Sequence, residues 1–228
     1  MQTTIDQYQT VIRAAAESKT PLRIRGGGTK DFYGNPAAEQ NSTLLDMSDY
    51  NGIVDYEPTE LVITARAGTR LADLEAELDR HGQMLAFEPP HFGSAATLGG
   101  CVAAGLSGPR RGAAGSVRDF VLGVRLLDGK GEDLHFGGQV MKNVAGYDVS
   151  RLMAGSMGTL GVLLEVSLKV LPKPAIETTL CMAMDEAAAI EKMNQWAGKP
   201  LPVSATCFID DQLFVRLSGP NRQCARPK

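Results

Sequence analysis

Six residues near the N-terminus, RGGGTK at positions 25–30, have the composition of an anion-binding loop. Glycine has no Cβ, so the successive backbone N–H groups of the three glycines can converge on a bound anion at short range. The hydroxyl of Thr29 and the ammonium of Lys30 could add a hydrogen bond and a positive charge. The chemistry that suits this stretch is the binding of a phosphate or pyrophosphate group.

The loop does not match two familiar phosphate-binding motifs. The Rossmann fingerprint has spaced glycines that open a helix, whereas the residues that follow here, DFYGNP at 31–36, are not typical of a helix start. The P-loop needs Gly-Lys-Ser/Thr in series, which is absent. Taken alone, GGGT is equally compatible with a flexible turn, so both interpretations stay open at this point.

Clusters of small residues recur at three later places, namely GSAATLGG (93–100), GLSGPRRGAAGS (105–116) and AGSMGTLGV (154–162). A core of small residues could account for one such segment. Four separated segments instead predict a long ligand that lies in a trench of exposed backbone.

Periodicity in the surrounding sequence predicts elements of both kinds, typical of an α+β fold. Apolar residues at helical spacing predict a helix that begins near Thr4, and alternation predicts a strand at 22–25 that leads directly into the glycines. The remaining predictions are strands at 43–46, 53–56, 61–65 and 162–170, a helix at 71–81, and a hairpin of 122–127 with 132–136.

A boundary is predicted near Lys173, because Pro172 and Pro174 end the last of these strands. The domain organisation predicted is therefore 1–173 followed by 174–228. The second region contains one predicted helix (185–198) and one predicted hairpin (205–219), which is little for an independent core.

Composition excludes some classes of function. The formal net charge of −3 argues against nucleic-acid binding, because nothing would neutralise a phosphate backbone. Four cysteines (Cys101, Cys181, Cys207 and Cys224) form no C-x-x-C pair, so neither a metal site nor an iron–sulfur cluster is predicted. No apolar stretch resembles a signal peptide or a membrane span, which predicts a cytoplasmic protein.

The motifs RGGGTK, EPP, TLGGCVAAGLSGPRRG, VRDFVLGVRLLDGKGE and KNVAGYDVSRLMAGSMGTLGVL, in this order, closely resemble a known family. This family is the PCMH-type FAD-binding domain of the vanillyl-alcohol oxidase and p-cresol methylhydroxylase superfamily. Within it, the sequence is most similar to the FAD-binding subunits of bacterial glycolate oxidases. The resemblance implies a two-subdomain FAD-binding domain over 1–173, followed by an α+β cap domain.

The resemblance also implies where FAD would bind. The triple-glycine loop would hold the pyrophosphate, and the segment 93–100 would line the flavin and ribityl chain. The segment 105–116 would lie near the isoalloxazine ring, and the segment 154–162 would approach the cofactor from the second subdomain. The residues implied are Arg25, Gly26, Gly27, Gly28, Thr29, Lys30, Gly93, Ser94, Thr97, Leu98, Gly99, Gly100, Ser107, Gly108, Gly155, Gly158, Gly161 and Val162.

Two departures from the family pattern lead to further expectations. Members that attach FAD covalently carry a histidine or cysteine at set positions, whereas Thr29 follows the glycines here, so non-covalent binding is expected. Cys101 is interpreted as a small buried thiol rather than a reactive one. Family members continue into a full cap domain, so 174–228 is expected to be an incomplete, truncated cap.

Oxidation of a 2-hydroxy acid by a flavin needs a base, a cation for the carboxylate and a stabilising group near the flavin. His91 is a weak candidate for the base, with packing as the favoured role. Lys142 and Tyr147 are weak candidates near the flavin, and Arg110 and Arg111 for the carboxylate. The alternatives are a loop-fixing ion pair for Lys142 and a solvated rim for the two arginines.

The function predicted on this basis is that of an FAD-binding subunit of a glycolate oxidase-type complex, which oxidises glycolate to glyoxylate. The family implies two partners, a second FAD-containing subunit and an iron–sulfur subunit that takes the electrons, with attachment at the periphery of the inner membrane through them. One alternative is another FAD-dependent 2-hydroxy-acid dehydrogenase or a cell-wall precursor reductase on the same scaffold. The other is a non-catalytic or truncated FAD-binding subunit.

Overall fold

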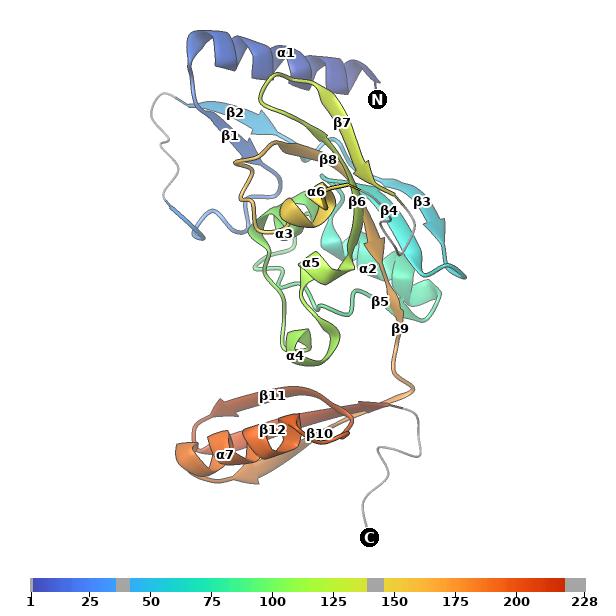
Figure 1. Cartoon of the computed structure of the whole chain (residues 1–228), viewed down its shortest axis with the longest axis vertical. Coiled ribbons are helices and arrows are strands. Elements are labelled where there is room, and N and C mark those ends of the chain that lie inside the picture. Colours follow the sequence, from blue (N-terminus) through green and yellow to red (C-terminus); the bar gives the residue numbers. More distant parts are fainter. Residues whose placement is uncertain (1, 36–41, 139–145, 220–228) are drawn as a thin grey trace.

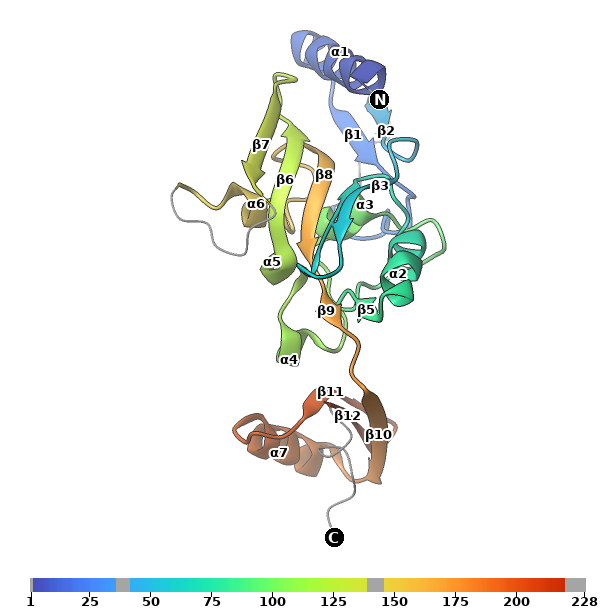
Figure 2. The ribbon, with the colours of Figure 1, turned by 90° about the vertical axis from the view of Figure 1, so that its right-hand side faces the viewer.

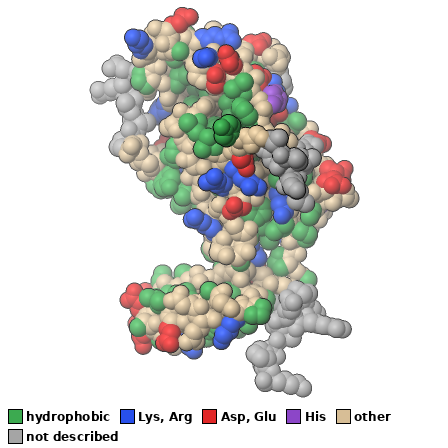
Figure 3. Space-filling model, viewed as in Figure 1, with side chains coloured by type: hydrophobic (Ala, Val, Ile, Leu, Met, Phe, Trp, Pro, Cys, Tyr) green, Lys and Arg blue, Asp and Glu red, His purple; other side chains and the backbone are tan. Residues whose placement is uncertain are grey.

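The computed structural model describes residues 2–35, 42–138 and 146–219. In these residues the chain forms a large lobe, up to Pro172, and a small lobe, Ile176 to Gly219 (Figures 1 and 2). The strand β9 (Leu171–Pro172) leads from one to the other, and the space-filling view shows a narrow waist there (Figure 3). No described helix combines the length and apolar character that a membrane crossing needs.

A five-stranded antiparallel sheet in the order β3-β4-β8-β6-β7 forms the centre of the large lobe. Its strands are β3 (Ile53–Glu57), β4 (Val62–Arg66), β6 (Val121–Leu127), β7 (Asp133–Gly137) and β8 (Val162–Lys169). The helices α2 (Leu71–Arg80) and α3 (Leu98–Ala104) contribute to the main core, where Leu74, Leu98 and Leu168 are fully buried. The predicted hairpin is confirmed as β6 paired with β7.

A second, smaller core lies under the N-terminal helix α1 (Gln2–Ser18). Ile5, Tyr8 and Ile12 share the buried face of α1, as their spacing predicted, and they pack with residues of β2 (Thr43–Asp46) and β8. The helix begins at Gln2, so Thr4 lies inside it and not at its start. The strands β1 (Leu22–Arg25) and β2 form a parallel pair beside this core.

Strand β8 belongs to both cores because its side chains alternate between the two faces of the sheet. Leu164 is fully buried in the α1 core, whereas its direct neighbour Leu163 is buried in the main core. Packing against β8 and against Leu127 of β6 therefore attaches α1 and β2 to the sheet, and hydrogen bonds from Gln9 and Arg13 to the carbonyl of Gly131 add to it.

The small lobe is a three-stranded antiparallel sheet in the order β10-β12-β11 with one helix against it. Its elements are β10 (Ile176–Ala183), α7 (Glu186–Ala197), β11 (Val203–Ile209) and β12 (Gln212–Gly219). Asp185 caps α7 by accepting the Ala188 N–H at 2.8 Å. The predicted helix and hairpin are confirmed, whereas β10, most of whose residues are exposed, was not predicted.

The short elements of the large lobe are β5 (Gln83–Met84), α4 (Arg111–Ala114), α5 (Val117–Phe120) and α6 (Val149–Leu152). Helix α3 forms within a segment whose small residues give a weak helical signal. It starts where the Thr97 Oγ1 accepts the Gly100 N–H at 3.3 Å, and it ends at Gly105, whose φ of 69° favours glycine. The fold is α+β, as the sequence predicted.

Candidate cofactor-binding cleft

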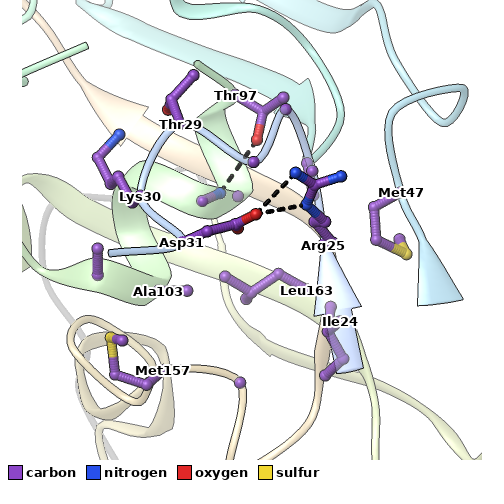
Figure 4. Close-up of a pocket in the computed structure, with 18 of the residues that line it drawn as sticks. Ile24, Arg25, Thr29, Lys30, Asp31, Met47, Thr97, Ala103, Met157 and Leu163 are labelled. Atoms are coloured by element: carbon purple, nitrogen blue, oxygen red, sulfur yellow. Dashed lines mark hydrogen bonds and ion pairs between the residues drawn. The ribbon is translucent and has the colours of Figure 1, made fainter. Parts of the chain in front are cut away.

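A cleft opens between the loop that follows β1 and the start of α3 (Figure 4). The loop before β8 closes another side. The enclosed volume is about 160 Å³, below the roughly 300–1,000 Å³ typical of small-molecule pockets, so a large ligand must extend beyond it. The residues that line the cleft are Ile24, Arg25, Gly26, Gly27, Gly28, Thr29, Lys30, Asp31, Met47, Ala67, Thr97, Gly99, Gly100, Ala103, Ala104, Ser156, Met157, Gly158, Gly161 and Leu163.

Two glycines of the RGGGTK loop are required by the packing of the protein itself. A Cβ added at Gly27 would lie 1.6 Å from the carbonyl oxygen of Ala95, and one at Gly26 would lie 2.3 Å from the Thr97 Oγ1. The loop is therefore pressed against the segment that leads into α3. Sequence reasoning assigned this freed space to a ligand, but at these two positions a neighbouring protein segment fills it.

The backbone amides of the same loop remain available to a ligand. Within the described ranges, no N–H group from Gly26 to Lys30 donates a hydrogen bond to the protein, although all five residues are partly buried. The Ser156 Oγ across the cleft is also buried and unpartnered there. Because partly buried polar groups need partners, a ligand rich in acceptors, such as a pyrophosphate with its ribose hydroxyls, fits these donors.

The charges that line the cleft sum to one positive charge. Arg25 and Lys30 are the basic residues and Asp31 is the acidic one. The Arg25 guanidinium pairs with the Asp31 carboxylate, with Nη2 and Oδ2 2.7 Å apart, so Lys30 supplies the excess charge. Burial lowers the pKa of Lys30, which means that a bound anion would relieve part of the cost of its charge. Its Nζ lies 5.8 Å from the centre of the Phe92 ring.

Eleven of the residues implied by the resemblance line this cleft, and they come from three of the four glycine-rich segments. They are Arg25, Gly26, Gly27, Gly28, Thr29, Lys30, Thr97, Gly99, Gly100, Gly158 and Gly161. The fold thus brings residues of the loop after β1, the start of α3 and the loop before β8 to one place.

Seven of the implied residues do not line the cleft: Gly93, Ser94, Leu98, Ser107, Gly108, Gly155 and Val162. Leu98 and Val162 are core residues, with 0% and 3% of their surface exposed. The Ser107 Oγ accepts the Val117 N–H at 2.9 Å. A Cβ at Gly108 would lie 2.3 Å from the carbonyl oxygen of Glu88, so this glycine too permits close packing.

Sequence reasoning missed the apolar part of the cleft and two polar residues. The apolar residues are Ile24, Met47, Ala67, Ala103, Ala104, Met157 and Leu163, and the polar ones are Asp31 and Ser156. Ser156 and Met157 lie between Gly155 and Gly158, which the resemblance implied as cofactor-binding residues, so their position in the sequence could have predicted that they line the cleft. Met47 and Ala67 come from other parts of the chain, and only the packing of β2 and β4 places them here.

The candidate catalytic residues do not gather at the cleft. The His91 Nε2 lies 3.0 Å from the Glu75 Oε2 on α2, and His91 is not among the lining residues. Tyr147 is 95% exposed, and Lys142 lies outside the described residues. Arg111 is exposed, but Arg110 is 8% exposed and pairs with carboxylates, so the solvated-rim interpretation is wrong for Arg110.

The thiol of Cys101, which follows the cleft-lining Gly100, is expected to be unreactive. Cys101 is fully buried in α3, and burial raises the pKa of its thiol to about 12. The reactive thiolate is therefore scarce at neutral pH, in agreement with a small buried thiol. Among the described residues no group of three or more His, Cys, Asp or Glu side chains could hold a metal ion.

Comparison with known proteins places this chain in a family. Residues 2–137 match the family model described as FAD binding domain. The chain is 53% identical to glycolate oxidase subunit GlcE of Escherichia coli strain K12 over 208 residues, which cover 91% of this chain and 59% of that protein. It is 30% identical to glycolate oxidase subunit GlcD of Bacillus subtilis strain 168, with 92% of this chain and 44% of that protein covered.

More distant similarity agrees with this placement. The chain is 30% identical to the D-lactate dehydrogenase of Anaerostipes hadrus, with 75% of this chain and 36% of that protein covered. A solved structure of alkyldihydroxyacetonephosphate synthase has the same fold, with a TM-score of 0.74 at 18% identity, over 94% of this chain and 45% of that one. The chain therefore spans between 36% and 59% of the length of these relatives.

The family match covers more than half of the chain, and the relatives extend it into the region that carries the fourth glycine-rich segment. The motifs, the fold and the donor-rich cleft agree with it. This chain belongs to the FAD binding domain family, in the PCMH-type superfamily that its motifs resemble, and its cofactor is FAD.

Proposed function

We propose that this chain is the FAD-binding part of a glycolate oxidase-type subunit, which oxidises a small 2-hydroxy acid to the 2-oxo acid. The observation that carries this proposal is the 53% identity to glycolate oxidase subunit GlcE, which extends across both lobes. The cleft supports it, because its donors suit a dinucleotide.

Bound FAD would supply the hydride acceptor for this oxidation. The backbone amides of residues 26–30 would hold the pyrophosphate, and Lys30 would offset part of its charge. The Ser156 Oγ would donate to a ribose or phosphate oxygen, and the apolar lining at Ala103 and Leu163 would pack against a ring or ribose. These contacts position the cofactor, while the base and the carboxylate-binding cation for the substrate are not assigned.

FAD is held without a covalent bond in this proposal. None of the residues that line the cleft, all within the described part of the chain, is a histidine or cysteine, which are the usual attachment points in the family. We expect acid precipitation of the purified protein to leave all of the flavin in the supernatant. Flavin absorbance that stays with the washed pellet would contradict non-covalent binding.

Substrate identity can be tested by flavin bleaching. Glycolate, D-lactate and D-2-hydroxyglutarate would be mixed anaerobically with the FAD-loaded protein in the presence of its partner subunits. We expect glycolate to bleach the flavin faster than D-lactate by about tenfold or more, which is the discrimination that one methyl group provides in a fitted pocket.

The outcomes of this assay separate the candidate functions. Faster bleaching by D-lactate would support another 2-hydroxy-acid dehydrogenase, an alternative favoured by the 30% identity to a D-lactate dehydrogenase. An FAD-loaded protein that none of these acids reduces would support a non-catalytic FAD-binding subunit.

We further propose that the partners are a second FAD-containing subunit and an iron–sulfur subunit that accepts the electrons. The separate subunit names of the relatives, GlcE and GlcD, support a complex of more than one subunit, and the FAD of the second subunit and the iron–sulfur subunit are inferred from the family resemblance. These subunits would also bring the protein to the membrane surface. Co-purification of this chain with both subunits, and loss of electron transfer when the iron–sulfur subunit is omitted, would test the assignment.

A further inference from the structure

A cluster of charges around the buried Arg110 connects the two lobes and has no role in the function proposed above. Its centre is Glu88, which follows the buried Phe87 in the large lobe. The φ of Glu88 is 49°, a left-handed conformation that non-glycine residues rarely adopt. Such backbone strain persists only where surrounding contacts impose it.

Contacts within the large lobe fix one side of Glu88. Its Oε2 accepts the backbone N–H of Arg110 at 2.9 Å, and its Oε1 accepts the Arg110 Nε at 3.3 Å. The Gly108 N–H donates to the carbonyl of Phe87 at 2.8 Å. Glu88 and its neighbour thereby hold the segment 105–110, which leads directly out of the cleft-lining helix α3.

Contacts with the small lobe fix the other side. The Nη2 of Arg216 on β12 lies 2.7 Å from the Glu88 Oε1. In return, the Arg110 Nη2 donates to the Oε2 of Glu177 on β10 at 2.6 Å. Each arginine thus pairs with a carboxylate of the opposite lobe, and α4, which starts after Arg110, contacts β11 (Figures 1 and 2).

Two hydroxyl groups complete the cluster. The Ser218 Oγ donates to the Glu177 Oε2 at 2.6 Å, and the Arg216 Nε donates to the Ser204 Oγ at 3.1 Å. The two arginines and two glutamates sum to zero charge. Burial opposes the ionisation of Glu88, but the hydrogen bonds from Arg216 and Arg110 outweigh it and hold its pKa below the ordinary value.

We propose that Glu88 is a positioning residue whose ion pairs with Arg110 and Arg216 lock the small lobe onto the segment that leads out of the cofactor-binding helix. We call the set Glu88, Arg110, Glu177, Arg216, Ser204 and Ser218 the interlobe bridge. Removal of the Glu88 charge takes one of two carboxylate partners from the buried Arg110 and the nearer one from Arg216, so the arrangement of the two lobes loses part of what holds it. The bridge thereby fixes the small lobe relative to the cleft.

Amide hydrogen exchange of the full chain tests this proposal at both ends of the bridge. In Glu88→Gln we expect exchange in the small-lobe segment 203–218 to become about tenfold faster or more, although the substitution lies in the large lobe. In Arg216→Gln we expect the same acceleration in the large-lobe segment 105–111. Helices α2 and α7 should keep their protection in both variants, which shows that each lobe remains folded.

Glu75→Gln is the matched control, because Glu75 pairs with His91 inside the large lobe. It should leave exchange at 203–218 unchanged. A Glu88→Gln variant that accelerates exchange only around its own loop would overturn the proposal, and so would equal effects of Glu75→Gln and Glu88→Gln on the small lobe.

A double substitution gives a second, independent test. If Glu88 and Arg216 act through each other, the double variant Glu88→Gln with Arg216→Gln should exchange no faster at 203–218 than the faster of the two single variants. If the acceleration of exchange in the double variant equals the product of the accelerations in the two single variants, Glu88 and Arg216 act independently and the coupling is refuted. Neither measurement needs FAD or turnover, so its failure would leave the proposed function untouched.

Discussion

Gly27→Ala is expected to abolish FAD binding and to lower the free energy of unfolding by about 3 kcal/mol. The reason is steric, since the new Cβ would lie 1.6 Å from the Ala95 carbonyl oxygen and 2.4 Å from its carbon. Both atoms are backbone atoms that lead into Thr97 and α3, and they have no rotamer to change. The loop and the start of α3 must separate, and their donors then no longer converge.

Gly112→Ala is the control for this experiment. Gly112 lies in α4, and a Cβ there would meet nothing within 4 Å. Alanine is better than glycine in a helix by about 0.5–1 kcal/mol, so this variant should be as stable as the natural chain or slightly more. Thermal unfolding and titration of FAD, followed by flavin fluorescence, would be measured for both variants.

Two more variants separate the steric effect from the electrostatic one. Lys30→Ala removes a charge at the cleft but meets no packing constraint, so it should weaken FAD binding by about 1 kcal/mol, or fivefold, and leave stability unchanged. Gly27→Asp adds a negative charge to the same clash and should bind no FAD either. If Gly27→Ala bound FAD normally and only Gly27→Asp failed, repulsion of the phosphate, and not the contact with Ala95, would be the cause.

Leu164→Ala is expected to lower the free energy of unfolding by about 2–5 kcal/mol, the usual cost of a large cavity in a core. Leu164 is fully buried on β8, in the core that attaches α1, β1 and β2 to the central sheet. Its neighbour Leu163 lines the cleft. A looser contact between α1 and the sheet should move the loop after β1 away from α3, so FAD binding should weaken as well.

Leu180→Ala serves as the comparison, because Leu180 on β10 is 47% exposed. This variant removes the same atoms from a site that retains water, and it should cost less than about 1 kcal/mol. Chemical denaturation and FAD titration of the two variants would be compared. A loss of stability without any loss of FAD affinity in Leu164→Ala would contradict the link between the α1 core and the cleft.

Local sequence determined most of the regular elements. Helices α1, α2 and α7 show apolar residues at helical spacing, and the turn at Asp128 to Gly131 marks the hairpin of β6 and β7, so each could be predicted from its own residues. Helix α3 and strand β10 were missed, as were the short elements β5, α4, α5, α6 and β9. The residues of α3 and β10 carry little periodicity, and these two elements form because Thr97 supplies a cap and β12 supplies a pairing edge.

The sequence by itself determined a glycine-rich loop with the composition of a phosphate site and four separated segments of small residues, and the resemblance of these ordered motifs to a known family implied FAD and the loops that would take part. Tertiary structure decided what each glycine is for. Gly27 and Gly108 leave room for the backbone of other segments, and Met47 and Ala67, which directly follow β2 and β4, line the cleft. It also decided that Arg110, whose charge suggested a substrate site, joins the two lobes. Such roles depend on contacts between residues far apart in the chain, and no local pattern encodes which partner a charge or a missing Cβ will meet.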